Sequence, residues 1–492
     1  MNIISKNLNQ KLKILLVSSE VVPFAKTGGL ADVAGSLPKA LAAMGHDVRV
    51  VMPKYREVGK KDTLCDFPVQ VGNRKETAIV RQDTMEAEGG NHVPVYFIDN
   101  YHYFDRDGLY LHRDEGERFG FFCRAVLEML PKVGFQPDII HCNDWQSGPI
   151  PLLLKDQYAK KPYYSKIATL FTVHNLLYQG NWDKGVLSFL GLDEKYFHPE
   201  AVEFYGQVSF IKTGLVFSDV INTVSNTYAV EIQTPEYGEG MDGLLRKRAG
   251  DLYGIINGLN YEEFNPATDP HIRKNYDFDS IQDKKVNKSA LQEELGLAVK
   301  DVPLIGLVSR LVDQKGLDLI ALVMDELLSA DVQLVVLGSG DPHYEQLFKG
   351  FQVRYPDKLG VYIGFNAELA QRIYAGSDLF LMPSKFEPCG LGQLISLRYG
   401  TIPIVRATGG LKDTINEFDG ETGKGNGFSF VPYLPADLLG AIKRGLTLFR
   451  NQPEQWGKLV ANALREDFSW DRSAKEYIRL YHVALGKHQG IN

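Results

Sequence analysis

The chain has 492 residues, 44% of them apolar and 23% charged, which excludes a disordered protein and predicts two or three domains. Its 54 Lys and Arg residues against 61 Asp and Glu give a formal net charge of −7, so no positive field draws in nucleic acid or an anionic membrane. Four scattered cysteines without a CxxC pair indicate neither a disulfide framework nor a zinc site and fit a reducing, cytoplasmic setting.

The first half alternates short apolar runs with longer amphipathic stretches. The run at 13–20 has too short an apolar core for a signal peptide and predicts a strand, and an amphipathic stretch at 30–45 and a second apolar run at 47–53 follow it. The apolar runs recur at 137–144, 166–175 and 219–225. This rhythm is typical of parallel α/β architecture. Residues 1–265 are therefore predicted to form one doubly wound domain, with an insertion around 60–120 that the pattern describes least.

A polar, turn-rich segment at 262–290 interrupts the rhythm, which resumes at residue 302. Four further apolar runs follow, at 332–341, 358–365, 378–384 and 401–407. Residues 266–470 are predicted to form a second α/β domain. The last segment, 471–492, is predicted to be an amphipathic helix that packs back on a domain surface. No run of the sequence approaches the roughly 18 uncharged apolar residues that span a bilayer, so no membrane association is expected.

Two similar loops follow apolar runs and open helices, TGGLAD at 27–32 and TGGLKD at 408–413. Ligands of open α/β sheets gather at such strand ends. The backbone amides of Gly28, Gly29, Gly409 and Gly410 could admit an anion at a helix N-terminus. Ordinary turn chemistry explains either loop equally well.

Cations and a carboxylate stand at strand ends of the second domain. Arg310 and Lys315 share one loop and suit a diphosphate, although a solvated helix start would carry the same residues. Glu387 precedes the turn Cys389-Gly390-Leu391-Gly392, where a carboxylate and exposed amides could hold sugar hydroxyls and phosphate. Alternatively, Glu387 is a helix-start charge and Cys389 a packed small residue.

The first domain places polar residues where two predicted strands end. His141 and Asp144 follow one strand, and His174 and Asn175 follow another. A lone histidine is more often structural than catalytic. His141 is therefore left without a role, and His174 gains interest only from its neighbours.

Seven motifs, in this order, resemble the bacterial glycogen synthases and plant starch synthases over nearly the whole chain. They read KTGGLADVAGSLPKAL, HCNDWQSG, FTVHNLLYQG, GIINGLNYEEFNP, SRLVDQKG, PSKFEPCGLGQL and TIPIVRATGGLKDT. The resemblance implies a GT-B fold, in which two Rossmann-like domains face a deep cleft. It also implies retaining transfer of glucose from ADP-glucose to the 4-hydroxyl of an α-1,4-glucan end, with release of ADP.

The resemblance assigns roles position by position. It implies His174, Arg310, Lys315 and Glu387 as catalytic residues. His174 contacts the sugar, the two cations bind the diphosphate and Glu387 positions glucose. The expected substrate-binding residues are Lys26, Gly28, Gly29, Asp32, Asp144, Asn175, Asn257, Phe365, Cys389, Gly390, Leu391, Gly392, Thr408, Gly409 and Gly410. Tyr101 and Tyr103, in the insertion, could stack on glucan or belong to the core.

The implied chemistry is front-face attack within a short-lived ion pair, in which the leaving phosphate takes the acceptor proton. No metal or other cofactor is expected, and the DxD-like tripeptides at 105–107 and 277–279 are interpreted as solvated loop acids. UDP-glucose as donor and an inactive glucan-binding regulatory protein remain open alternatives. A dehydrogenase is disfavoured because the first turn reads KTGGL and not GxGxxG. The sequence says nothing of the oligomeric state.

Overall fold

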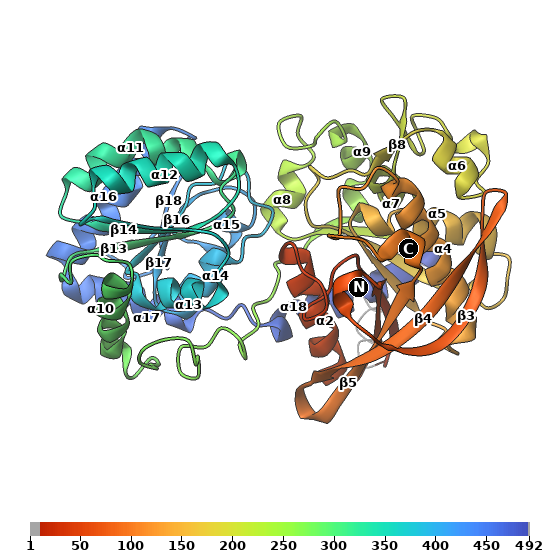
Figure 1. Ribbon diagram of the computed structural model, residues 1–492, viewed down its shortest axis with the longest axis horizontal. Coiled ribbons are helices and arrows are strands. Elements are labelled where there is room, and N and C mark those ends of the chain that lie inside the picture. The colour runs from red at the N-terminus through yellow and green to blue at the C-terminus, as the bar shows by residue number, and fades with distance from the viewer. Residues whose placement is uncertain (1–9, 491–492) are drawn as a thin grey trace. The chain divides into compact units, whose positions relative to one another are not determined.

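The computed structural model describes residues 10–490, so residues 1–9 and 491–492 of the expected first and last segments lie outside the described residues. The chain divides into two compact units (Figure 1). Unit 1 comprises the residues up to Gly258 and those from Trp470 onward, and unit 2 is Leu259–Ser469. The chain thus changes units after Gly258, where the sequence suggested residue 265, and returns after Ser469. Within residues 10–490, none of the helices combines the length and apolar character needed to span a bilayer.

Unit 1 is built on a nine-stranded sheet with the order β12-β11-β7-β6-β1-β2-β5-β4-β3. Its strands are β1 (Lys13–Val17), β2 (Asp47–Pro53), β3 (Asp62–Val71), β4 (Arg74–Ala87), β5 (Asn91–Asp99), β6 (Ile139–Asn143), β7 (Ala168–Val173), β11 (Val220–Thr223) and β12 (Leu252–Gly254). All pairs from β12 to β5 are parallel, while β4 and β3 add an antiparallel hairpin. The insertion therefore extends the sheet.

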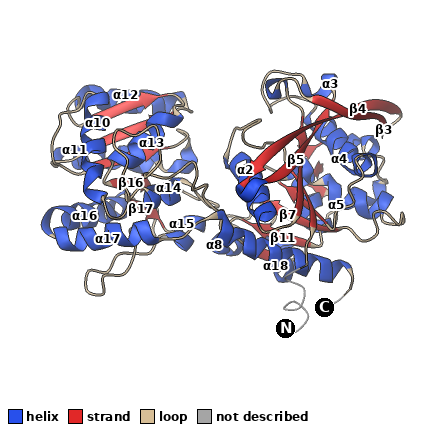
Figure 2. Ribbon diagram, turned by 90° about the horizontal axis from the view of Figure 1, so that it is seen from below, coloured by secondary structure: helices blue, strands red, loops and turns tan. Residues whose placement is uncertain are grey.

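Helices cover both faces of this sheet, which buries the apolar runs of its central strands. The helices are α2 (Gly29–Ala43), α3 (Tyr101–Phe104), α4 (Glu115–Lys132), α5 (Pro149–Leu153), α6 (Gly185–Phe189), α7 (Phe210–Phe217), α8 (Asn226–Glu231), α9 (Asp242–Lys247) and α18 (Trp470–His488). In Figure 2, α2 lies on one side of the strands and α4 and α5 on the other. A small separate sheet contains β8 (Asn181–Trp182), β9 (Glu203–Phe204) and β10 (Gln207–Ser209).

The C-terminal helix α18 packs on unit 1 through a buried polar network. His141 contacts the Tyr481 hydroxyl through Nδ1 at 2.9 Å and the Thr172 hydroxyl through Nε2 at 2.6 Å. Burial lowers the pKa of His141 to about 3, so the imidazole is neutral at ordinary pH. His141 joins strand β6 to α18 and has a structural role.

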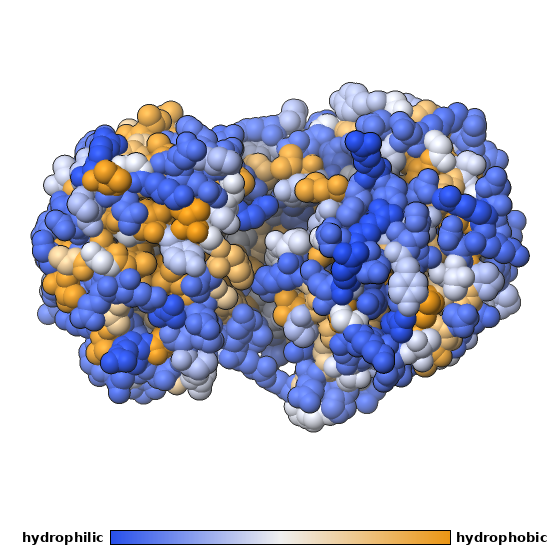
Figure 3. Space-filling view, viewed as in Figure 1, coloured by the Kyte–Doolittle hydropathy of each residue, from blue (hydrophilic) through white to orange (hydrophobic). Residues whose placement is uncertain are grey.

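Unit 2 has a six-stranded, fully parallel sheet with the order β15-β14-β13-β16-β17-β18. Its strands are β13 (Leu304–Val308), β14 (Gln333–Gly338), β15 (Leu359–Ile363), β16 (Leu379–Met382), β17 (Ile402–Arg406) and β18 (Phe428–Phe430). Its helices are α10 (Lys284–Glu294), α11 (Leu317–Ser329), α12 (Pro342–Arg354), α13 (Ala367–Gly376), α14 (Gly392–Arg398), α15 (Gly409–Thr414), α16 (Pro435–Asn451) and α17 (Pro453–Arg465). Helices α11 and α12 lie on one side of the sheet and α13 and α14 on the other (Figure 1). The visible face of each unit is mostly hydrophilic (Figure 3).

Both sheets reverse their strand order at one point. In unit 1, β1 lies between β2 and β6, and in unit 2, β13 lies between β14 and β16. Ligands of open α/β sheets bind outside the carboxyl ends of the strands at such a switch point. The loops that follow β1, β6 and β7 in unit 1, and β13, β16 and β17 in unit 2, are therefore the places to look for a site.

Candidate active site

The loop after β1 carries the first TGG motif and leads into α2. Lys26 Nζ lies 2.7 Å from Asp32 Oδ1, and the Lys26 side chain is 47% exposed. Burial raises the pKa of Asp32, while the neighbouring Lys26 ammonium opposes that rise. Lys26 thus remains accessible at the helix start with one carboxylate beside it.

Glu20, which the sequence analysis did not identify, accepts three hydrogen bonds from this loop. Its Oε2 accepts the backbone amides of Thr27 at 2.5 Å and Gly28 at 3.1 Å, and its Oε1 accepts the Thr27 hydroxyl at 2.8 Å. Of the two alternatives left open for the Gly28 amide, an anion contact and ordinary turn chemistry, the structure shows an internal contact, because this amide donates to a protein carboxylate. Glu20 could have been identified by its position shortly after a buried strand, because functional residues of open α/β sheets lie at such strand ends.

The loops after β6 and β7 are joined by Asp144. Its carboxylate accepts the backbone amide of His174 at 2.7 Å and that of Asn175. Its backbone has a φ of 53°, a strained conformation for a residue other than glycine. Burial raises the pKa of Asp144 to about 7, and the charge of Glu20 adds to the rise. Asp144 therefore shapes the loop that carries His174.

His174 is a partly buried, neutral imidazole that directly follows β7. Its Nε2 lies 2.9 Å from Asn143 Oδ1, and burial lowers its pKa to about 3. A neutral imidazole can donate one hydrogen bond and accept another. Asn175 turns the chain by accepting the Leu177 amide at 3.1 Å. Asn257 is buried in the same unit, and its Oδ1 has no hydrogen-bond partner in the described part of the chain.

In unit 2, the predicted residues meet around a cavity of about 220 Å³ at the switch point. The structure thereby brings together side chains from the loops after β13 and β16. The predicted residues that line it are Arg310, Lys315, Glu387, Gly390, Leu391 and Gly392. The remaining walls are contributed largely by strand ends and by Tyr374, Ser384 and Ile395.

The two cations of this cavity differ in their surroundings. Lys315 Nζ lies 2.6 Å from Glu387 Oε2, and the two side chains are only 17% and 9% exposed. The Ser384 hydroxyl donates to the same oxygen at 3.0 Å. Arg310 is exposed, and its guanidinium has no hydrogen bond or ion pair among residues 10–490. The guanidinium is thus available to an anion, whereas the ammonium already belongs to a buried pair.

The second TGG loop, after β17, packs tightly on the Glu387 segment. Gly409 has a φ of 46°, and a Cβ there would lie 2.0 Å from the Glu387 carbonyl oxygen. The Gly410 amide donates to the Glu387 and Pro388 carbonyls, both at 3.1 Å, so this amide too is engaged within the protein. Thr408 precedes α15 and is buried, as is Cys389. This loop fixes the backbone that presents Glu387.

Several other predicted residues lie away from these clusters. Phe365 follows β15 and is 86% exposed. Tyr103 belongs to the core of unit 1, whereas Tyr101 is 65% exposed. Asp105 and Asp107 pair with the Arg56 guanidinium, which supports their interpretation as loop acids. Asp277 accepts the Ser280 hydroxyl at 2.6 Å in an exposed turn.

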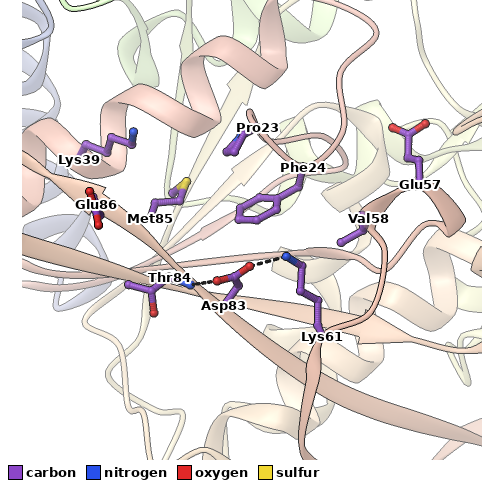
Figure 4. A pocket seen from close by; sticks show the side chains of 10 residues that line it. All are labelled: Pro23, Phe24, Lys39, Glu57, Val58, Lys61, Asp83, Thr84, Met85 and Glu86. Atoms are coloured by element: carbon purple, nitrogen blue, oxygen red, sulfur yellow. Dashed lines mark hydrogen bonds and ion pairs between the residues drawn. The ribbon is translucent and has the colours of Figure 1, made fainter.

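A further pocket of unit 1, of about 490 Å³, lies beside the turn that precedes Lys26. Figure 4 shows the Phe24 ring on one side of it and the Lys61–Asp83 ion pair on another. The Lys61 ammonium also lies 5.1 Å from the centroid of the Phe24 ring. None of its lining residues was predicted as a site residue, and Lys61 and Asp83 partner each other.

Two Rossmann-like units, each with polar loops at its switch point, define a glycosyltransferase of the GT-B class. Residues 13–247 match the starch synthase catalytic domain, and residues 291–461 match the glycosyl transferases group 1 family. The chain belongs to the family of bacterial glycogen synthases and plant starch synthases. The predicted fold class and the predicted glycosyltransferase activity are thereby confirmed.

Individual relatives agree with this assignment. The chain is 61% identical to the glycogen synthase of Desulforudis audaxviator over 97% of this chain and 98% of that protein. It is 51% identical to the glycogen synthase of Thermotoga maritima, over 97% and 99%. The catalytic domain of starch synthase IV from Arabidopsis thaliana, bound to ADP and acarbose, superposes with a TM-score of 0.90 at 35% identity, covering 97% of this chain and 100% of that one. Sucrose-phosphate synthase from Thermosynechococcus elongatus, at 20% identity and a TM-score of 0.59 over 96% and 98% of the two chains, shares the fold.

Proposed function

We propose that this enzyme transfers glucose from ADP-glucose to the 4-hydroxyl at the non-reducing end of an α-1,4-glucan, with retention of anomeric configuration. The observation that carries the proposal is the cavity of unit 2, where an accessible guanidinium, a buried ammonium and a carboxylate meet. A diphosphate and a sugar need those groups together. The related starch synthase IV, whose structure holds ADP and acarbose, supports a nucleotide and a glucan as the ligand classes.

The proposed reaction breaks the bond between C1 of glucose and the β-phosphate oxygen and forms a bond between C1 and the acceptor O4. The acceptor proton passes to the departing phosphate, so no protein base is needed. Arg310 and Lys315 offset the negative charge that grows on the leaving oxygen. Glu387 holds glucose hydroxyls, and the neutral His174, whose Nε2 donates to Asn143 Oδ1, accepts a hydrogen bond from a sugar hydroxyl at Nδ1. The proposal assigns no step to a metal ion.

Lys26 and the loop it starts are assigned to substrate contact from unit 1. Its ammonium is exposed beside Asp32 and can reorient toward an anionic or hydroxyl group, since lysine has a long, flexible stem. Asp144 contributes by holding the backbone of His174 and Asn175. The proposal thus assigns roles to residues of both units.

The test is a donor comparison on purified protein with a glucan primer. ADP-glucose should give glucan-dependent release of ADP, and UDP-glucose should give a much smaller rate. Glucan extended with α-1,4 linkages would confirm retention. Glu387→Gln should abolish the activity, while Lys349→Ala, at an exposed position of α12, should leave it unchanged. Equal or faster turnover of UDP-glucose would refute the donor assignment, and binding of both substrates without turnover would favour a regulatory protein.

A further inference from the structure

We propose that Glu20 is a positioning residue, whose carboxylate holds the loop at 26–29 in the shape in which it meets substrate. The inference rests on the proposed function, because it gives that loop its task. Glu20 lies three residues after the end of β1, at the switch point of unit 1, and the residue is only 5% exposed. It is therefore placed to act on the loop and not on the substrate.

The carboxylate of Glu20 receives four hydrogen-bond donors and forms no ion pair within residues 10–490. Three come from the loop, namely the amides of Thr27 and Gly28 and the Thr27 hydroxyl. Hydrogen bonds to an ionised acceptor are roughly twice as strong as neutral ones. The two amides also stand at the N-terminus of α2, a 15-residue helix, where the helix dipole favours a negative charge. These contacts fix the two backbone amides that flank the Thr27 Cα.

The fourth donor shows that Glu20 is itself held in place. The Tyr110 hydroxyl donates to Glu20 Oε1 at 3.0 Å and lies 2.8 Å from the Ser19 hydroxyl. The Ser18 hydroxyl donates to the Glu20 carbonyl at 2.6 Å. Tyr110 belongs to the segment between α3 and α4, far from the loop in sequence. The orientation of the carboxylate is thus set by the surrounding unit before any substrate arrives.

A second consequence follows from the charge. Two adjacent amides at a helix start form an anion site, and Glu20 fills it with a fixed carboxylate. Without Glu20, a phosphate group of the substrate could occupy those amides in an unproductive pose. The loop would then have a different shape, and the exposed side chain of Lys26, one residue before Thr27, would have a different orientation. Glu20 should therefore affect turnover through geometry, although it touches no reacting atom.

The experiment compares Glu20→Gln and Glu20→Ala with the control Glu88→Gln, an exposed acid of the same unit. Hydrogen exchange at the Thr27 and Gly28 amides should become faster in both Glu20 variants and stay unchanged in the control. Turnover of the full chain, measured as kcat/KM for the donor, should fall roughly 10- to 100-fold, the scale of a small misplacement of a binding group. Formate, a free carboxylate, should restore part of the rate of Glu20→Ala in a saturable manner, and chloride should not.

Tyr110→Phe provides a milder test that keeps the ring and removes one donor. It should speed exchange of the same amides slightly and lower the rate a few-fold, and it guards against a Glu20 variant that fails to fold. The proposal would be overturned if the Glu20 variants kept normal turnover although their amides exchanged fast. It would also be overturned if a folded variant lost turnover while the Thr27 and Gly28 amides stayed protected, or if formate did not restore turnover of folded Glu20→Ala. Failure of the proposed function shows itself separately, as a wild-type chain without glucan-dependent ADP release but with the same exchange pattern.

Discussion

Arg310→Ala and Lys315→Ala should separate catalysis from stability, because the structure places these two cations in different surroundings. Arg310 is exposed and its guanidinium has no polar partner among the described residues, so its removal should change the free energy of unfolding by no more than about 0.5 kcal/mol. Lys315 forms a pair with Glu387 in which the side chains are 17% and 9% exposed. Breaking such a pair leaves a buried carboxylate and costs about 3–5 kcal/mol.

Both variants should nevertheless lose turnover, since both cations are proposed to stabilise the leaving diphosphate. Loss of one such partner typically lowers kcat by roughly 10²–10³. Arg310→Lys should recover little, because an ammonium lacks the planar fork of a guanidinium. In the double variant Lys315→Ala with Glu387→Gln, neutralising the carboxylate should restore part of the stability without restoring activity.

The assays are urea unfolding for stability and ADP release for kcat and the donor KM. If both single variants keep the wild-type kcat and only raise KM, the cations bind ground-state phosphate and the catalytic roles are wrong. If Arg310→Ala loses as much stability as Lys315→Ala, the difference in surroundings described above does not govern their energetics.

Three further predictions concern other features of the molecule. A chelator should leave the rate unchanged, because the proposed chemistry uses Arg310 and Lys315 for charge stabilisation; loss of activity that magnesium restores would contradict this. Burial lowers the pKa of His141 to about 3, so the unfolded chain takes up a proton below its ordinary value near 6.5 while the folded chain does not. Unfolding should therefore become easier by about 2 kcal/mol between pH 7 and pH 5 on account of this residue, and His141→Gln should show a correspondingly flatter pH dependence of stability. Gly409→Ala should reduce both stability and kcat, since its Cβ would lie 2.0 Å from the Glu387 carbonyl oxygen, and a fully active variant would show that this backbone position does not matter.

The parallel core of both units was predictable because its strands are continuous apolar runs, which burial on both faces demands. The hairpin β3–β4 was not, since its strands are antiparallel and largely polar on one face. A period-two signal did exist, because Phe67, Val69 and Val71 alternate with exposed residues. The hydrophobic pattern also did not predict the division of the chain after Gly258. The polar segment at 262–290, which suggested a boundary, already lies in unit 2.

The site was predictable where side chains carry the chemistry and unpredictable where the backbone does. Arg310, Lys315 and Glu387 stand at predicted strand ends, the family resemblance implies their roles, and the structure gathers them around one cavity. Two of the four donors to Glu20 are the backbone amides of Thr27 and Gly28, and every residue type except proline has such an amide, so the sequence does not single them out. The same limit explains why the role of the glycine amides was left open.

The two TGG loops share one physical property, which follows from those amides. Glu20 occupies the Gly28 amide, and the carbonyls of Glu387 and Pro388 occupy that of Gly410. Both loops are therefore ordered by internal acceptors. The conformational entropy lost when these loops become ordered is lost when the chain folds, so substrate binding does not have to supply it. Because these two amides are engaged, neither is available to the substrate's negative charge in this structure. The Arg310 guanidinium forms no ion pair with a described residue, so a substrate anion meets its whole positive charge. The Lys315 charge is partly neutralised by its ion pair with Glu387.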